Sequence, residues 1–176
     1  MNKRVILLTG GARSGKSRKA LELASGYRRK AFIATAEPLD FEMEKRIAAH
    51  RRERGDGFVT VEEPVDLSGA IASLPTGTEV AVIDCLTVWL GNLLYRFREP
   101  EEWLRPVESF LKTLKSPPCT LVIVTNEVGM GIVPQERATR EYRDLAGEVN
   151  QRVAAAADTV LFMSCGLPLV LKEREK

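Results

Sequence analysis

One stretch near the N-terminus limits the possible folds more than any other part of the chain. Residues 10–17 read Gly-Gly-Ala-Arg-Ser-Gly-Lys-Ser and fit the G-x-x-x-x-G-K-[ST] pattern of a phosphate-binding loop. Before them, residues 5–9 form a continuous apolar run, which is typical of a strand buried on both faces. After them, residues 18–25 show a short helical pattern that stops at Gly26. A strand, a glycine-rich turn and a helix in this order predict a site for a nucleoside triphosphate.

The residue types in the loop suit phosphate binding. Glycines let backbone N–H groups approach phosphate oxygens closely, and the helix that follows adds the positive end of its dipole. We expect the Lys16 ammonium to reach the β- and γ-phosphates and to be catalytic, and the Ser17 hydroxyl to ligate Mg²⁺. The predicted nucleotide-binding residues of the loop are Gly10, Gly11, Ala12, Arg13, Ser14, Gly15, Lys16 and Ser17.

The rest of the chain alternates apolar runs with helical patterns. We predict strands at 5–9, 31–34, 58–61, 80–83 and 120–125, and helices at 18–25, 41–54, 66–73, 86–97, 101–115 and 140–157. Residues 160–163 and 169–171, on either side of Gly166-Leu167-Pro168, predict a closing hairpin. Strands that are apolar throughout indicate a parallel sheet covered by helices on both faces. The expected fold class is therefore α/β, a mostly parallel sheet with a C-terminal hairpin, in a single domain over residues 1–176.

Polar residues follow several of these strands. In such sheets ligands bind at the carboxyl ends of the strands, which places residues 10–17, residues 35–37, Asp84 and Asn126-Glu127 on one rim. An aspartate that ends a buried strand is the pattern of the acid that holds Mg²⁺ beside a phosphate loop, so we assign Asp84 to the metal together with Ser17. Glu127 is either a general base or metal support, or an ordinary solvated loop acid.

The predicted helix 41–54 contains the chain's single histidine. Arg46, His50 and Arg54 are spaced by four residues and share one face. This basic face is either simply solvated or it binds an anion. If it binds a triphosphate, His50 is the candidate nucleophile, because histidine can form a covalent intermediate that divides one group transfer into two.

Composition adds limits. The net charge of +2 gives no reason to expect binding to nucleic acid or to a membrane surface, and no segment approaches the length of a membrane span. The N-terminal apolar run is too short for a secretory signal. Cys85, Cys119 and Cys165 lack metal-ligand spacing, so we expect buried, reduced thiols in a cytoplasmic protein.

Several stretches resemble those of a known family, the bifunctional adenosylcobinamide kinase / adenosylcobinamide-phosphate guanylyltransferases of cobalamin biosynthesis. The most specific is residues 124–134, Val-Thr-Asn-Glu-Val-Gly-Met-Gly-Ile-Val-Pro; the others are 9–18, 33–36, 46–51, 92–94, 143–147 and 149–158. The resemblance implies a P-loop NTPase fold of the RecA-like kind and assembly as a homotrimer.

The resemblance also implies two reactions. ATP or GTP phosphorylates adenosylcobinamide, and GTP then donates GMP to that phosphate through a guanylylated histidine, which matches His50. It extends the GTP contacts beyond the loop to Ala34, Thr35, Ala36, Arg51, Arg52, Glu53, Arg54, Glu62 and Asp84. At position 84 family members can carry glutamate, so the aspartate is a departure that shortens the side chain by one methylene. For the corrinoid, small and apolar residues at 128–134 and 86–94 are candidates.

Two other functions fit parts of the sequence. A plain small-molecule kinase would leave His50 without a role. A non-catalytic nucleotide switch or an assembly ATPase would use the same loop, although the Asn-Lys-x-Asp motif of guanine-binding switches does not occur in the chain.

Overall fold

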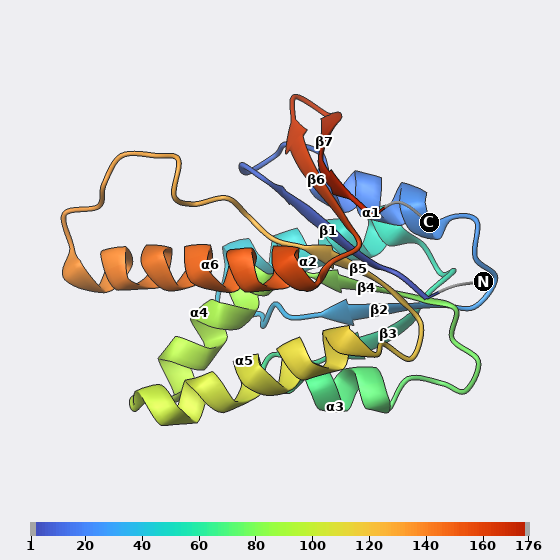
Figure 1. Cartoon of the computed structure of the whole chain (residues 1–176), viewed down its shortest axis with the longest axis horizontal. Helices are drawn as coiled ribbons and strands as arrows, with labels where there is room; N and C mark the ends of the chain where they lie inside the picture. The colour runs from blue at the N-terminus through green and yellow to red at the C-terminus, as the bar shows by residue number, and fades with distance from the viewer. Residues whose placement is uncertain (1–2, 175–176) are drawn as a thin grey trace.

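Seven strands form one sheet in the order β3-β2-β4-β5-β1-β6-β7 (Figure 1). The computed structural model describes residues 3–174. The strands are β1 Val5–Gly10, β2 Lys30–Ala34, β3 Val59–Glu62, β4 Val80–Asp84, β5 Thr120–Val124, β6 Thr159–Ser164 and β7 Leu167–Glu173. The helices are α1 Lys16–Ala24, α2 Phe41–Arg54, α3 Leu67–Ala72, α4 Leu86–Arg96, α5 Pro100–Lys115 and α6 Arg137–Ala156.

The sheet is parallel except at one edge. Strands β1 to β6 pair in parallel with their neighbours, and only β7 runs antiparallel, against β6. The predicted mostly parallel α/β sheet with a C-terminal hairpin is therefore confirmed. The register sets Asp84 of β4 between Ala34 of β2 and Val124 of β5, so the ends of these strands meet at one edge.

The two faces of the sheet bury alternate residues of the same strands. Leu7, Ile83 and Ile123 point into the larger core, which α3, α4, α5 and α6 cover. Leu8 and Val82, their neighbours in the chain, belong to a smaller core covered by α1. In Figure 1, α1 accordingly lies on the opposite side of the sheet from α3 and α5. Double coverage explains why these strands are apolar at every position.

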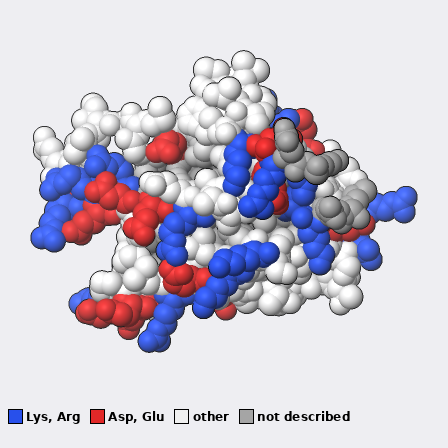
Figure 2. Space-filling model, viewed as in Figure 1, with Lys and Arg blue, Asp and Glu red and all other residues white. Residues whose placement is uncertain are grey.

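Charged side chains of both signs are mixed on the face shown in Figure 2. Arginines on α6 pair with acidic side chains nearby: Arg152 with Glu108 of α5, and Arg137 with Glu141 one turn later, both at 2.6 Å. This face therefore presents no extended patch of one sign, in line with the small net charge of +2.

The closing hairpin differs from the prediction at its turn. Leu167 and Pro168 belong to β7, and the chain reverses at Cys165 and Gly166, both at positive φ. Proline is tolerated there because β7 is an edge strand, where a missing N–H does not break the sheet. Cys165 is exposed, so the prediction of three buried thiols is wrong at this position; Cys85 and Cys119 are buried.

Candidate nucleotide and guanylyl-transfer site

The phosphate loop closes around the ammonium group of Lys16. Its Nζ donates hydrogen bonds to the carbonyl oxygens of Gly10 (2.9 Å) and Gly11 (2.5 Å), and to Ser14 Oγ at 3.4 Å. Burial lowers the pKa of Lys16, and nearby Cys85 and Asp84 partly oppose that shift. A buried cation held only by neutral oxygens is suited to neutralising the charge of a bound phosphate.

Ser17 and Asp84 come together as predicted for a magnesium site. Ser17 Oγ donates a hydrogen bond of 2.8 Å to Asp84 Oδ2. Burial raises the pKa of the Asp84 carboxyl, while the bond from Ser17 and the charges of His50, Lys16 and Arg54 act against that shift. The shorter aspartate side chain thus still reaches Ser17. A hydroxyl and a carboxylate are oxygen ligands that Mg²⁺ accepts alongside nucleotide phosphates.

The rim predicted from the strand ends is present. The Thr35 N–H donates to the Asp84 carbonyl (3.2 Å), and the Glu127 N–H donates to the Gly10 carbonyl (3.0 Å). The Thr35 hydroxyl accepts from the Cys85 N–H (2.8 Å) and donates to the Cys85 carbonyl (2.9 Å), beside a cis peptide bond between Asp84 and Cys85. Glu127 Oε1 accepts from a nearby backbone N–H, that of Gly129.

Helix α2, which contains His50, is attached to this rim only lightly. The helix has the predicted bounds, and Asp40 caps it by accepting a hydrogen bond from the Met43 N–H (2.7 Å). None of its residues is buried, and His50 is exposed to solvent. The charge of His50 nevertheless acts to lower the pKa of the Asp84 carboxyl, against the larger effect of burial.

The C-terminal end of α2 makes the contacts with the rim. Arg51 forms an ion pair with Glu62 at the end of β3, and the Arg54 guanidinium lies 4.3 Å from the centre of the Phe32 ring. Two other residues predicted to bind the nucleotide, Arg52 and Glu53, are not brought to the rim. Arg52 Nε donates to the Ala48 carbonyl of its own helix (3.3 Å), and Glu53 is exposed.

The basic face of α2 is less basic than the sequence alone indicated. Arg46, at one end of the face, pairs with Glu42 one turn earlier at 2.6 Å. The Lys45 ammonium lies 4.2 Å from the centre of the Phe41 ring. The cations that remain nearest the rim are therefore those of the last helical turn.

Sequence reasoning missed the part that the β6–β7 turn plays in the loop. The Gly166 N–H donates to the Ser14 carbonyl (3.1 Å). A Cβ on Gly10 would lie 2.3 Å from the Met163 carbonyl oxygen, and one on Gly15 would lie 3.2 Å from the Gly166 Cα. The hairpin therefore supports the loop from behind. Only the glycine at position 166 signals this in the sequence, because the contact joins distant parts of the chain.

The two segments named as candidates for corrinoid contact differ in exposure. Residues 86–94 lie in α4, whose side chains Leu86, Leu90 and Leu93 belong to the core. In the loop after β5, Met130 and Ile132 are 77% and 96% exposed. That loop stays a prediction for corrinoid contact.

A phosphate loop after the interior strand β1, an acid at the end of β4 and this strand order define a P-loop nucleotide-binding α/β protein. Solved structures agree on the fold: a Pyrococcus horikoshii OT3 protein matches with a TM-score of 0.59 at 9% identity, over 98% of this chain and 88% of its own. The ATPase EscN of the enteropathogenic Escherichia coli type III secretion system matches with a TM-score of 0.59 at 11% identity, over 93% of this chain and 43% of its own.

Within that class, the chain belongs to the cobinamide kinase / cobinamide phosphate guanyltransferase family, whose model matches residues 6–171. The bifunctional adenosylcobalamin biosynthesis protein CobU of Escherichia coli K12 is 39% identical over 96% of this chain and 99% of its own length. The corresponding protein CobP of Pseudomonas aeruginosa is 41% identical over 94% of this chain and 96% of its own length. The chain is accordingly an enzyme of the transferase class.

Proposed function

We propose that this protein phosphorylates adenosylcobinamide with ATP or GTP, and then transfers GMP from GTP to the product through a guanylylated His50. The observation that carries the proposal is the meeting of three parts at one rim: the loop around Lys16, the Ser17–Asp84 pair, and the end of the His50 helix, which the Arg51–Glu62 ion pair attaches to β3. The family description supports the substrate.

For the kinase step, the loop holds the triphosphate while the corrinoid hydroxyl approaches the γ-phosphorus in line with the leaving oxygen. Lys16 Nζ shifts from its carbonyl partners to the phosphate oxygens, and the loop N–H groups bind the leaving diphosphate. Ser17 and Asp84 would hold Mg²⁺, which when bound neutralises charge on the β- and γ-oxygens.

For the guanylyl step, an imidazole nitrogen of His50 forms a bond to the α-phosphorus, and the bond from that phosphorus to the bridging oxygen breaks. Pyrophosphate leaves, stabilised by the same lysine and loop amides. An oxygen of adenosylcobinamide phosphate then attacks the phosphorus, and the histidine–phosphorus bond breaks to give adenosylcobinamide-GDP. The exposed position of His50 leaves it open to both partners.

We also propose that α2 moves when nucleotide binds and brings His50 to the α-phosphate. The helix buries no residue and is followed by Gly55 at positive φ, which permits a hinge. The ion pair of Arg51 with Glu62 ties its end to the rim. Superimposable α2 positions in nucleotide-free and GTP-bound crystals would contradict this motion.

The covalent step is tested with GTP labelled at the α-phosphate. The protein should acquire label that is acid-labile and base-stable, as for a phosphoramidate, and His50→Ala should acquire none while keeping its kinase activity. An unlabelled wild-type protein with kinase activity would leave the plain kinase as the function. Slow hydrolysis without any corrinoid acceptor would favour an assembly ATPase.

A homotrimer is part of the same proposal. Strand β7 exposes Leu167, Leu169, Val170 and Leu171 to solvent at the free edge of the sheet, and such a face suits association with another copy. Light scattering after size-exclusion chromatography would give the mass of the assembly. Within the described residues, no helix is long and apolar enough to cross a membrane, and a cytoplasmic location stays a prediction.

A further inference from the structure

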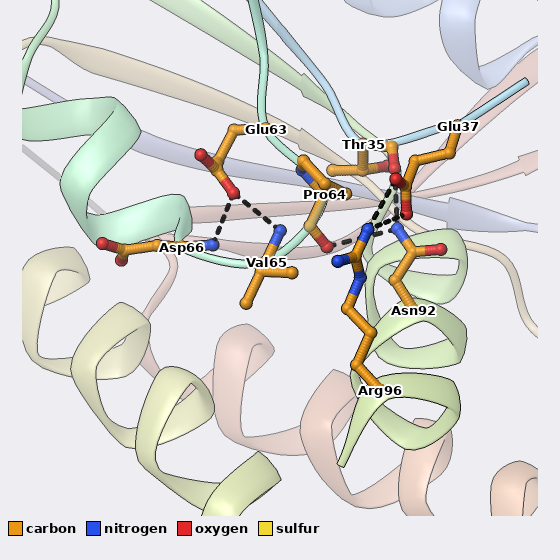
Figure 3. A network of polar contacts seen from close by, with 8 residues as sticks. All are labelled: Thr35, Glu37, Glu63, Pro64, Val65, Asp66, Asn92 and Arg96. Carbon is orange, nitrogen blue, oxygen red and sulfur yellow. Dashed lines mark hydrogen bonds and ion pairs between the residues drawn. The ribbon is translucent and has the colours of Figure 1, made fainter.

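A single buried asparagine joins two of the connections that line the rim (Figure 3). Asn92 of α4 is 8% exposed and lies on the face that packs toward the sheet. Its Nδ2 group donates one hydrogen bond to the Thr35 carbonyl (2.8 Å) and another to the Pro64 carbonyl (3.2 Å). A buried amide is stable only when it is hydrogen-bonded, so both carbonyls are held at the spacing that this amide sets.

Two further residues of the same helix hold the same connections. One turn after Asn92, the Arg96 guanidinium binds both carboxylate oxygens of Glu37, at 2.5 and 2.6 Å. One turn before it, Trp89 Nε1 donates to the Val65 carbonyl at 2.7 Å. Spacings of three and four residues put these side chains on one face of α4, as Figure 3 shows for Asn92 and Arg96.

Both connections lead directly to the nucleotide site. The first follows β2, and its Thr35 N–H donates to the carbonyl of Asp84, the partner of Ser17. The second follows β3, whose Glu62 pairs with Arg51 of α2. The α4 face therefore holds two rim segments, one bonded to Asp84 and the other continuous with the strand end that pairs with α2.

We propose that Asn92 and Arg96 are positioning residues that set the spacing of the β2 and β3 ends and thereby hold the nucleoside end of GTP. They do so without touching the nucleotide. The inference rests on the proposed function for its ligand. It predicts that losing either residue weakens contacts to the guanosine part of GTP and leaves phosphate binding by the loop unchanged.

The test compares two ligands of the same variants. GTP uses the whole site, whereas inorganic tripolyphosphate uses the phosphate loop alone. Asn92→Asp removes both donated hydrogen bonds and sets a carboxylate against two carbonyls; we expect the Kd for GTP to rise about tenfold. Arg96→Ala should raise it about threefold, because this pair is partly exposed, and Arg96→Lys by less. For each variant the Kd for tripolyphosphate should stay within about twofold of wild type.

Arg152→Ala provides a matched control. Arg152 makes an ion pair of 2.6 Å with Glu108, and its side chain is 35% exposed compared with 42% for Arg96. The pair joins α6 to α5, away from the rim residues. Removing it should leave both dissociation constants at the wild-type values.

Equal losses for GTP and tripolyphosphate would overturn the inference, because they would indicate general damage to the loop. Unchanged GTP binding in both variants would overturn it as well. If Asn92→Asp does not fold, the charge-swapped pair Glu37→Arg with Arg96→Glu decides: recovery of GTP affinity relative to Arg96→Glu alone supports the inference, and no recovery refutes it. The proposed function is tested separately, by the labelling experiment with GTP: it fails if the wild-type protein acquires no label on His50.

Discussion

Replacing Asp84 with asparagine should make the nucleotide-free protein more stable while removing its activity. Asp84 is half-buried, and the pKa of its carboxyl is raised, chiefly by burial. In the absence of ligand, its charge therefore destabilises the fold. Functional sites commonly keep such groups even though they lower stability.

The size of the effect follows from opposing contributions. Removing a buried ion recovers several kcal/mol if burial is complete, and less here because the residue as a whole is only half-buried. Against this, the bond from Ser17 loses its charged acceptor, about 1 kcal/mol, and Lys16 loses a nearby negative charge. The balance is a gain of about 1.5 kcal/mol, which for a chain of this length raises Tm by about 3–6 °C.

The stability advantage of Asp84→Asn over the wild type should increase with pH. Because the folded state raises the pKa above the ordinary value of 3.8, the native wild type binds this proton more tightly than the unfolded chain does. Wild-type stability therefore falls as the pH rises from 3.8 through the raised pKa. The amide of the Asp84→Asn variant does not titrate, so the advantage of the variant should be full above that range and should vanish below it.

Thermal unfolding of both proteins in EDTA, from about pH 4 to about pH 8, measures this directly. Asp56→Asn is the control, since Asp56 is an exposed loop acid and its replacement should change stability by less than about 0.5 kcal/mol. With Mg²⁺ and GTP the order should reverse, because only the wild type gains full stabilisation from the ligand. A variant that is less stable than wild type without ligand, or whose advantage does not change with pH, would refute the reasoning.

Three other changes test neighbouring parts of the site. Gly10→Ala should destabilise the protein by about 2–4 kcal/mol in denaturant unfolding, because the new Cβ meets the carbonyl behind the loop, whereas Gly26→Ala meets no atom within 4 Å and should be nearly neutral. Asp40→Ala removes the cap of α2, about 1 kcal/mol, and should speed hydrogen exchange across residues 43–50 without changing Tm, because none of the helix residues is fully buried; a lowered Tm would contradict that. Ile132→Asp should raise KM for adenosylcobinamide at least about threefold while leaving the Kd for GTP unchanged; an unchanged KM would exclude this loop from corrinoid contact.

The fold was predictable because, along most of the chain, the sequence pattern of each segment agrees with the position that the segment takes in the sheet. Runs such as 80–83 are apolar at every position, which only a doubly covered strand requires, and the acid at 84 falls where ligand sites occur in such sheets. The errors lie at segment ends. Leu167 and Pro168 look like a turn in sequence but extend β7, because an edge strand accepts proline.

The candidate site was predictable where one motif or one strand end supplies the residues. The loop and its pairing with Asp84 needed only the rule that parallel strands end together. What could not be predicted depends on contacts between distant segments: the β6–β7 turn behind the loop, and the amide of Asn92 that joins Thr35 to Pro64. In sequence, Asn92 is a polar residue in a mostly apolar helix, which does not reveal its partners.

The phosphate loop is firmly held, whereas helix α2 is only weakly attached. This difference suits the two proposed transfers, both of which use a nucleoside triphosphate as donor. The loop, Asp84 and Thr35 stand on strands in the core, so a triphosphate would always bind in one position. Kinase chemistry needs its γ-phosphorus free for the acceptor, whereas guanylylation needs its α-phosphorus next to His50. If His50 were fixed at the α-phosphate, GTP would be diverted into the covalent intermediate whether or not phosphorylated acceptor was present. A helix that buries no residue can instead approach and withdraw, so one binding position can serve both reactions, each of which consumes its own triphosphate molecule.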